Sequence, residues 1–311
     1  MTQVEDTSRD MRLDPDSFAQ GYFKNAVYRH WDPYAIEGLE SDLERMIDYA
    51  PPEAEFDELR TSIARFGAGE EAVTEDLMPL AMVLEDINDQ MFISSQIYEE
   101  AKHTQFFDRY WREVINPAAE ELGYEVTNPT DQRYFNDDYI ALFDKTEAAM
   151  ERLLEDDSPR ARTEAYCHYQ LTVESVLAQT GYYGLTSSFS DRGSDEVTEA
   201  DYPNADGLVE GIGKIRSDEG RHVGFGMQKV RDYVQSGAVD EGVVQDTLQD
   251  LMPNVAGVFS DLTEGINPAP LVAYSRDKLT RRIEIITDSS AEIPDVDELV
   301  KLDDSDPAAA D

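Results

Sequence analysis

EEAKH at residues 99–103 and DEGRH at residues 218–222 each place a Glu three residues before a His. Residues at i and i+3 share one face of a helix, about 5–6 Å apart at Cβ, so each pair can bind one ion. Both pairs continue an apolar helix face, where an ionised Glu is costly unless a partner neutralises it. The sequence has only 26 basic residues against 67 acidic ones, so the partner that we expect is a cation from solution. The paired residues are Glu100 with His103 and Glu219 with His222.

Each pair is preceded by a segment that carries a Glu among apolar residues. Glu70 precedes Val73 at helical spacing, and Glu174 lies between Leu171 and Leu177. The order along the chain is therefore Glu, Glu-x-x-His, Glu, Glu-x-x-His. Ferritin-like dinuclear carboxylate proteins bind two metals with this set, one Glu from each of two helices and Glu-x-x-His from each of the other two. Four carboxylates and two imidazoles favour iron or manganese over zinc, which takes fewer and softer ligands.

The hydrophobic pattern predicts an all-α chain. Apolar residues recur at three- and four-residue spacing, whereas runs of alternating β-branched residues bounded by turn residues are scarce. The expected architecture is a ferritin-like four-helix bundle with additional helices and a dinuclear metal site inside the bundle. The boundaries that we predict are a disordered N-terminus at 1–20, the helical domain at 21–290 and an acidic disordered tail at 291–311.

The composition limits the functional classes. The formal net charge is −41, which disfavours binding to nucleic acid or to an anionic membrane surface. No run of 18 apolar residues is present, so we expect no membrane span, and the polar N-terminus lacks the apolar core of a signal peptide. The single Cys, Cys167, excludes an internal disulfide. These features predict a cytoplasmic protein, and acidic residues spread over the whole chain favour a halophilic origin, where salt screens their repulsion.

Three segments resemble the ligand-binding oxidases, which are relatives of the ribonucleotide reductase small subunit. The segments are FGAGEEAVT (residues 66–74), EEAKHTQFF (99–107) and IRSDEGRHVGFG (215–226). The resemblance covers roughly residues 20–290. It implies an oxidoreductase whose metal centre activates dioxygen, and it implies a homodimer.

The resemblance also implies a cofactor and a ligand. We expect one Mn and one Fe per chain, with a di-iron centre as the alternative, and a long-chain fatty acid or similar apolar ligand beside the metals. The first ion, expected to be Mn, is held by Glu70, Glu100 and His103. The second ion, expected to be Fe, is held by Glu174, Glu219 and His222, with at least one Glu bridging.

Four further residues match functional positions of this family. The family forms an ether cross-link between a Val three residues after the first Glu and a Tyr five residues before the Glu of the second half. These positions hold Val73 and Tyr169, for which plain core packing is the alternative. Trp31 and Asp218 are expected to form the family's hydrogen-bonded relay to His103.

Two other functional classes stay open. A small subunit of ribonucleoside-diphosphate reductase would generate a radical or a high-valent metal oxidant for a large subunit. The radical-bearing Tyr of such subunits lies four residues after the first His, where this chain has Phe107, although a manganese/iron subclass also has Phe there. Such subunits also carry a relay Tyr in a C-terminal tail, whereas the last Tyr here is Tyr274. The third class is iron storage or a plain helical bundle, to which the match at Val73 and Tyr169 gives no support. For Tyr182 and Tyr183, redox activity and plain packing are the two alternatives, and we expect packed side chains.

Overall fold

The computed structural model of the chain, which describes residues 12–191, 196–198 and 200–302, is built from helices. Four long helical segments form a central bundle. They are α3 (Glu53–Val83), α4 (Ile87–Tyr110), a continuous helix made of α7 (Pro159–Tyr166), η5 (Cys167–Ala178) and α8 (Gln179–Phe189), and α9 (Asp206–Gln235). The only extended pairing in the described ranges is an isolated bridge between Thr198 and Ile266. The predicted all-α, ferritin-like fold is therefore confirmed.

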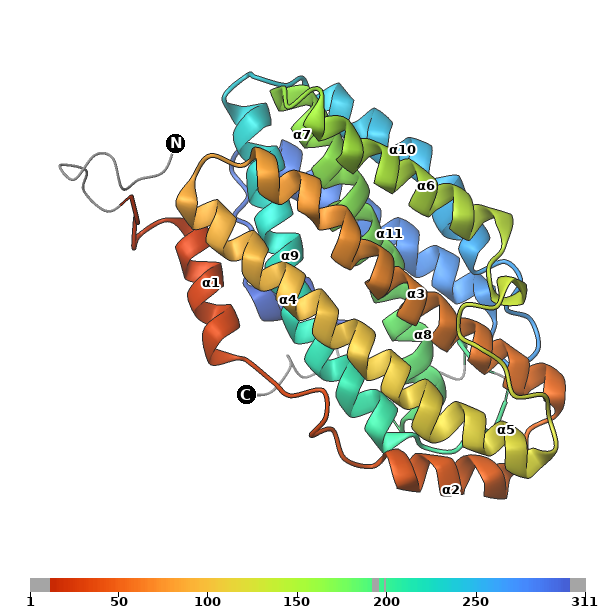
Figure 1. Ribbon diagram of the computed structural model, residues 1–311. Coiled ribbons are helices and arrows are strands. Elements are labelled where there is room, and N and C mark those ends of the chain that lie inside the picture. The colour runs from red at the N-terminus through yellow and green to blue at the C-terminus, as the bar shows by residue number, and fades with distance from the viewer. Residues whose placement is uncertain (1–11, 192–195, 199, 303–311) are drawn as a thin grey trace.

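The bundle consists of two helix pairs, because α3 packs along α4 and α9 packs along η5 and α8 (Figure 1). Further helices surround it. They are α1 (Phe18–Tyr28), α2 (Leu39–Tyr49), α5 (Asn116–Leu122), α6 (Asp137–Glu151), α10 (Glu241–Val258), α11 (Pro268–Thr287) and α12 (Val296–Leu299), with short turns η2 (Trp111–Ile115), η3 (Gln132–Tyr134) and η4 (Arg152–Leu154). α6 packs with α10 on one side of the bundle, whereas α1 lies against α4 and α9 on another. No helix in the described part of the chain is both long and apolar enough to cross a membrane.

Two of the bundle helices have local features that bear on the site, a side-chain cap at the start of α4 and a π-helical segment in the third helix. At the start of α4 the side chain of Asp86 accepts a hydrogen bond from the amide of Asn88, which satisfies an amide that has no partner within the helix. From Cys167 to Ala178 the third bundle helix is a π-helix. This winding is rare in proteins overall, and where it occurs it often lies at a functional site. This π-helical segment carries Tyr169 and Glu174, two of the predicted site residues.

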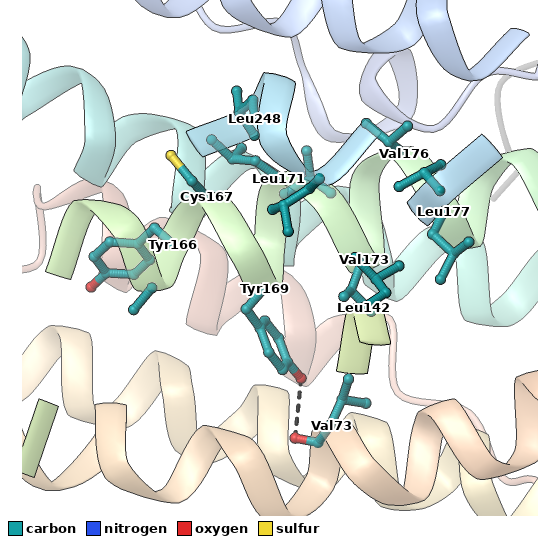
Figure 2. Close-up of a cluster of buried hydrophobic side chains, with 14 of the residues drawn as sticks. Val73, Leu142, Tyr166, Cys167, Tyr169, Leu171, Val173, Val176, Leu177 and Leu248 are labelled. Atoms are coloured by element: carbon teal, nitrogen blue, oxygen red, sulfur yellow. Dashed lines mark hydrogen bonds between the residues drawn. The ribbon is translucent and has the colours of Figure 1, made fainter. Parts of the chain in front are cut away.

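Two hydrophobic clusters fill the bundle on either side of its centre. The first includes Val73, Leu142, Tyr166, Tyr169, Leu171 and Leu248 (Figure 2). The second includes Phe56, Ile63, Phe106, Trp111, Tyr182, Ile212 and Ile215. Along α3, α4 and α9, the predicted metal ligands fall between the residues of one cluster and those of the other. On the third bundle helix, Glu174 follows Val173 and precedes Val176 of the first cluster. A polar layer is therefore enclosed by close-packed apolar side chains on both sides.

The helical domain extends beyond the predicted boundaries at both ends. α1 begins at Phe18, where Ser17 caps the helix, and α12 packs against α9. Leu299 in α12 is fully buried. Both helices are short and acidic residues flank them, so the sequence shows little periodicity there. Residues 1–11 and 303–311 lie outside the described residues, and their predicted disorder stays a prediction.

Residues 296–302, which we call the C-terminal strap, lie against α9 and are held by side chains of the helical domain. The guanidinium of Arg282 donates to the carbonyl of Leu299 at 2.7 Å. At Gly220, a Cβ would lie 2.5 Å from the carbonyl oxygen of Val296, so this close approach requires glycine. The strap thus covers α9 within the second Glu-x-x-His motif.

The crossing of α9 over α4 predicts opposite effects for two neighbouring glycines. A Cβ at Gly211 would overlap the ring of Phe106, which is fully buried, whereas a Cβ at Gly213 would meet nothing within 4 Å. Gly211→Ala is expected to lower the free energy of unfolding by about 1–3 kcal/mol through overpacking. Gly213→Ala is expected to raise it by up to about 1 kcal/mol through helix propensity. Denaturant unfolding of both variants checks this, and equal effects at the two sites would contradict the crossing geometry.

Candidate metal centre

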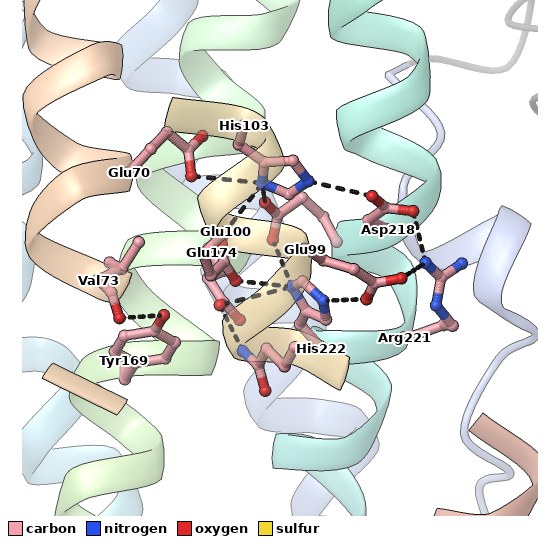
Figure 3. Close-up of polar contacts among 12 residues, drawn as sticks. Glu70, Val73, Glu99, Glu100, His103, Tyr169, Glu174, Asp218, Arg221 and His222 are labelled. Atoms are coloured by element: carbon pink, nitrogen blue, oxygen red, sulfur yellow. Dashed lines mark hydrogen bonds and ion pairs between the residues drawn. The ribbon is translucent and has the colours of Figure 1, made fainter. Parts of the chain in front are cut away.

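The six predicted ligands converge in the polar layer between the two hydrophobic clusters (Figure 3). α3 supplies Glu70, α4 supplies Glu100 and His103, η5 supplies Glu174, and α9 supplies Glu219 and His222. Ligand atoms within 4.8 Å of one another form two groups, Glu70, Glu100, His103 and Glu219 in one and Glu100, Glu174, Glu219 and His222 in the other. Because Glu100 and Glu219 belong to both groups, the arrangement offers two adjacent ion positions with two shared carboxylates.

Both imidazoles turn Nδ1 toward the centre of this cluster. His103 Nδ1 lies 3.1 Å from Glu100 Oε2 and 3.4 Å from Glu70 Oε2. His222 Nδ1 lies 3.0 Å from Glu100 Oε1 and 3.4 Å from Glu219 Oε2. The spacing of three residues places each Glu and His of a motif on the same helix face, as expected from the sequence. The two Nδ1 atoms are therefore the nitrogens directed into the cluster.

Several buried polar atoms of the cluster form no aligned hydrogen bond among the described residues, although His222 Nδ1 and Glu100 Oε1 lie only 3.0 Å apart. They are Glu100 Oε1, Glu174 Oε2, Glu219 Oε2 and His222 Nδ1. Buried polar atoms are normally paired, so unpaired atoms that face one another point to a missing partner. Divalent cations between them would satisfy all of these atoms, and four carboxylates with two imidazoles suit iron or manganese. The residues present therefore fit a dinuclear metal cofactor.

Burial dominates the ionisation of the glutamates. It raises the pKa of Glu70 to about 8 and raises the pKa of Glu174 well above its ordinary value, with the charge of Glu219 adding to the second effect. Burial also raises the pKa of Glu219, and the charge of Glu100 adds to it. Burial alone would raise the pKa of Glu100, but the charge of His222 leads the interactions that hold this pKa well below its usual value. Without metal, the site keeps protons that cations would displace.

An outer carboxylate faces the far nitrogen of each imidazole. Asp218 Oδ2 lies 3.2 Å from His103 Nε2, and Trp31 Nε1 donates to the same oxygen at 2.7 Å, so the structure brings together the three members of the predicted relay. Glu99 Oε2 lies 2.8 Å from His222 Nε2. A ligating imidazole usually donates its other N–H to such a group, which fixes the ring and raises its basicity. Each imidazole is therefore oriented from outside the cluster.

Glu99 and Arg221 belong to this outer layer, although the sequence-based site does not include them. Arg221 is fully buried and donates to Glu99 Oε1 and to Asp218 Oδ1, both at 2.5 Å. The sequence carries a signal for Glu99, because an acidic residue directly precedes the Glu of each motif: Glu99 precedes Glu100, and Asp218 precedes Glu219. Arg221 gives no comparable signal, since a charged residue inside a helical motif normally faces solvent.

The predicted cross-link pair lies beside the ligands. The hydroxyl of Tyr169 donates to the backbone carbonyl of Val73 at 3.2 Å, and both side chains are buried (Figure 3). Burial, reinforced by the charge of Glu100, raises the pKa of Tyr169 well above its ordinary value. The phenol is therefore protonated at neutral pH and is directed at Val73.

A cavity of about 80 Å³ adjoins the cluster. Its polar end is lined by the ligand carboxylates Glu70, Glu100, Glu174 and Glu219. Its remaining wall is largely apolar and includes Phe66, Val73, Val173, Leu177, Phe259, Leu262 and Leu271. A wall of this kind suits an apolar ligand with one polar group directed at the metals.

The neighbouring tyrosines differ in their surroundings. Tyr183 stacks on Tyr274 with ring centroids 4.6 Å apart, as expected for a packed side chain. Tyr182 stacks on Phe66, but its hydroxyl also donates to Glu70 Oε1 at 3.3 Å. Packing alone is therefore an incomplete description of Tyr182, which contacts a predicted ligand.

The fold and the cluster define an all-α, ferritin-like protein with a buried centre of the dinuclear carboxylate type. No family model matches the chain. Among solved structures, the chain is similar to R2-like ligand-binding oxidases. Two mutants of such an oxidase, with aerobically and anaerobically reconstituted Mn/Fe cofactors, share 26% and 27% identity with TM-scores of 0.72 and 0.74. A mutant with an aerobically reconstituted Fe/Fe cofactor shares 26% identity with a TM-score of 0.73. Each comparison covers 88% of this chain and 94% of the other.

The resemblance expected from the sequence is confirmed by this similarity, and so is the assignment as an oxidoreductase. The expected Mn/Fe pair, with a di-iron centre as the alternative, is the type of cofactor that these structures carry. The six residues expected as ligands meet at one place, and Val73, Tyr169, Trp31 and Asp218 all lie in or next to the same layer.

The raised pKa values predict that metal binding strengthens with pH. Glu70, with a pKa of about 8, holds a proton near pH 7, and a cation must displace it. Burial raises the pKa of Glu174 and Glu219 as well, which shifts these two carboxyls toward their protonated forms. Affinity for Mn(II) is expected to rise by up to about tenfold per pH unit for each displaced proton below pH 8. Above pH 8 the contribution of Glu70 to this rise is expected to disappear, because Glu70 is then ionised without metal. Titration calorimetry in buffers of different ionisation enthalpy measures both quantities, and pH-independent affinity without proton release would contradict the expectation.

Proposed function

We propose that this protein is a dioxygen-activating oxidase with a Mn/Fe centre, that it binds a long-chain fatty acid or similar ligand, and that it forms an ether between Val73 and Tyr169. The observation that carries the proposal is a single cavity whose wall joins four ligand carboxylates to apolar side chains, with Val73 in that wall. The likeness to R2-like ligand-binding oxidases supports the same reading.

The ligand sets follow from the two groups of converging atoms. Glu70 and His103 serve one ion, Glu174 and His222 serve the other, and Glu100 and Glu219 reach both positions. When bound, such a pair supplies electrons to dioxygen and the power to cleave an unactivated C–H bond. The protein's own part is to fix the carboxylates and imidazoles, to exclude water with the two hydrophobic clusters, and to hold the reacting side chains in place.

The cross-link requires the loss of two hydrogens from this chain. One leaves Val73 Cβ and the other leaves the hydroxyl of Tyr169, so that a C–O bond replaces a C–H and an O–H bond. Dioxygen accepts the two electrons and two protons. The hydrogen bond from Tyr169 to the carbonyl of Val73 supports this pairing, because it holds the phenol at the correct residue before reaction.

The apolar ligand is proposed from the cavity wall. Most of its lining side chains are apolar, among them Phe259 and Leu262, and they adjoin the four carboxylates at one end. A carboxylate head group would complete the coordination at the polar end.

The cross-link is expected in protein loaded with Mn(II) and Fe(II) and then exposed to air. Peptide mass spectrometry should find the peptides of Val73 and Tyr169 joined and two hydrogens lighter than their sum. Tyr169→Phe removes the oxygen and should abolish the product, while metal loading and the fold persist. Anaerobic samples serve as the second control, and formation of the same product without dioxygen would contradict the proposed oxidant.

A radical-generating small subunit of ribonucleotide reductase is the second candidate. The connected side chains of Trp31, Asp218 and His103 are compatible with it, but they do not separate it from the oxidase, because both classes can retain this relay. Phe107 lies where a radical-bearing Tyr would be expected, which weighs against it. Full metal occupancy without any cross-link in the experiment above would make this candidate the leading one, and binding to a large subunit would then test it.

We also propose that the protein acts as a cytoplasmic homodimer in a halophile. The net charge of −41 supports the salt adaptation, because ions at high concentration screen repulsion among the carboxylates.

The unfolding temperature is therefore expected to rise by about 5 °C or more between 0.1 M and 2 M KCl. Over this range the Debye length, the distance over which charges repel one another, falls from about 10 Å to 3 Å or less. Differential scanning calorimetry of the metal-free protein measures the shift, and choline chloride at equal ionic strength separates screening from specific cation binding. An unfolding temperature that does not change with salt would remove the argument for adaptation.

A further inference from the structure

Arg221 joins the outer layers of the two ion positions. It lies on α9 between Glu219 and His222, and its side chain is fully buried. One guanidinium nitrogen, Nη2, donates both to Asp218 Oδ1 and to Glu99 Oε1, at 2.5 Å each (Figure 3). The other, Nη1, donates to Asn25 in α1 at 3.1 Å, so the group is held from a third helix as well.

The two carboxylates use their remaining oxygens on the two imidazoles. Asp218 Oδ2 lies 3.2 Å from His103 Nε2, and Glu99 Oε2 lies 2.8 Å from His222 Nε2. The connection is crossed, because Asp218 of α9 orients the His of α4 while Glu99 of α4 orients the His of α9. A continuous series of hydrogen bonds thus runs from one imidazole through Arg221 to the other.

We propose that Arg221 is a positioning residue shared by both metal positions, which sets the orientation of the two imidazoles together. The proposal rests on the proposed dinuclear centre. A guanidinium suits this task because it is permanently charged and planar and presents several donors in a fixed fork, whereas an ammonium is a point charge. Its two carboxylates are buried, so each needs a compensating partner in this place.

The two ends of this connection are supported unequally. Asp218 Oδ2 also accepts from Trp31 at 2.7 Å and from Lys102 at 3.0 Å. Among the described residues, Glu99 has hydrogen bonds only to Arg221 and His222. Loss of the fork therefore leaves Asp218 held by other donors but leaves Glu99 with the imidazole alone. The ion position of His222 is expected to depend on Arg221 more strongly than that of His103.

The test uses the full chain, Mn(II) alone and the variant Arg221→Lys, which keeps a positive charge but loses the fork. Metal content after gel filtration gives the number of ions, and electron paramagnetic resonance distinguishes a coupled pair from an isolated Mn(II). The wild type is expected to bind two ions as a coupled pair. Arg221→Lys is expected to bind the second ion at least tenfold more weakly and to show the signal of an isolated ion.

Three further variants locate the effect. Glu99→Gln is expected to reproduce the loss of one ion. His222→Gln by itself removes the ion position of His222, so adding Arg221→Lys to it is expected to lower Mn(II) binding little further. His103→Gln removes the other ion position, so adding Arg221→Lys to it is expected to abolish Mn(II) binding. The matched control is Arg216→Lys on the same helix, because Arg216 is also buried but donates to the carbonyl of Val300 in the strap at 2.5 Å. This control is expected to keep the coupled pair.

The outcomes separate the two proposals. A wild type that does not bind two ions overturns the proposed dinuclear centre. A wild type that binds a coupled pair, with Arg221→Lys or Glu99→Gln binding two ions equally tightly, overturns the role of Arg221 and leaves the centre intact. Circular dichroism of each metal-free variant checks the fold. If Arg221→Lys does not fold, Glu99→Gln decides the matter, because that variant keeps Arg221 and Asp218 paired and removes only the charge on Glu99.

Discussion

Burial of four glutamates and two histidines in one layer is the constraint on which the rest of this structure depends. Such a layer is unfavourable by itself, because removal of a charge from water costs several kcal/mol unless a partner compensates it. The raised pKa of Glu70 and the carboxylate oxygens without an aligned hydrogen bond are two signs of this cost. Two cations remove the cost, and the long helices and the two hydrophobic clusters are what hold the ligands close enough to share them.

The outer carboxylates give the layer its rigidity. If each helix oriented its own imidazole, α4 and α9 could shift relative to each other without breaking the outer hydrogen bonds. The crossed arrangement of Glu99 and Asp218 prevents this, because every outer bond to an imidazole runs between the two helices. The distance between the two ion positions is therefore tied to the packing of α4 against α9, and the glycine at 211 that allows the ring of Phe106 to approach is part of the same contact.

The convergence of the six residues could be predicted from the sequence because its signal is local. A spacing of three residues on an apolar helix face identifies Glu100 and His103, and the same pattern identifies the second pair. Trp31 and Asp218 were accessible only through resemblance to a known family. Glu99 has only a weak signal, the acid directly before each motif, because one more acid carries little information in a sequence with 67 acidic residues. Arg221 has no signal, because the partner of a buried Arg is set by the packing of distant helices. For the same reason α12 could not be predicted from the sequence, because its burial depends on a surface that α9 provides.

The C-terminal strap has a consequence for the order in which the site is assembled. All six ligand residues lie before Gln235, the last residue of α9, whereas the strap begins at residue 296. At a synthesis rate of about 5–20 residues per second, the strap follows α9 after roughly 3–12 s. During this interval the nascent chain has all four ligand helices but no cover over Gly220. The strap surface of α9 at Gly220 therefore becomes buried only after every residue of the cluster has been synthesised.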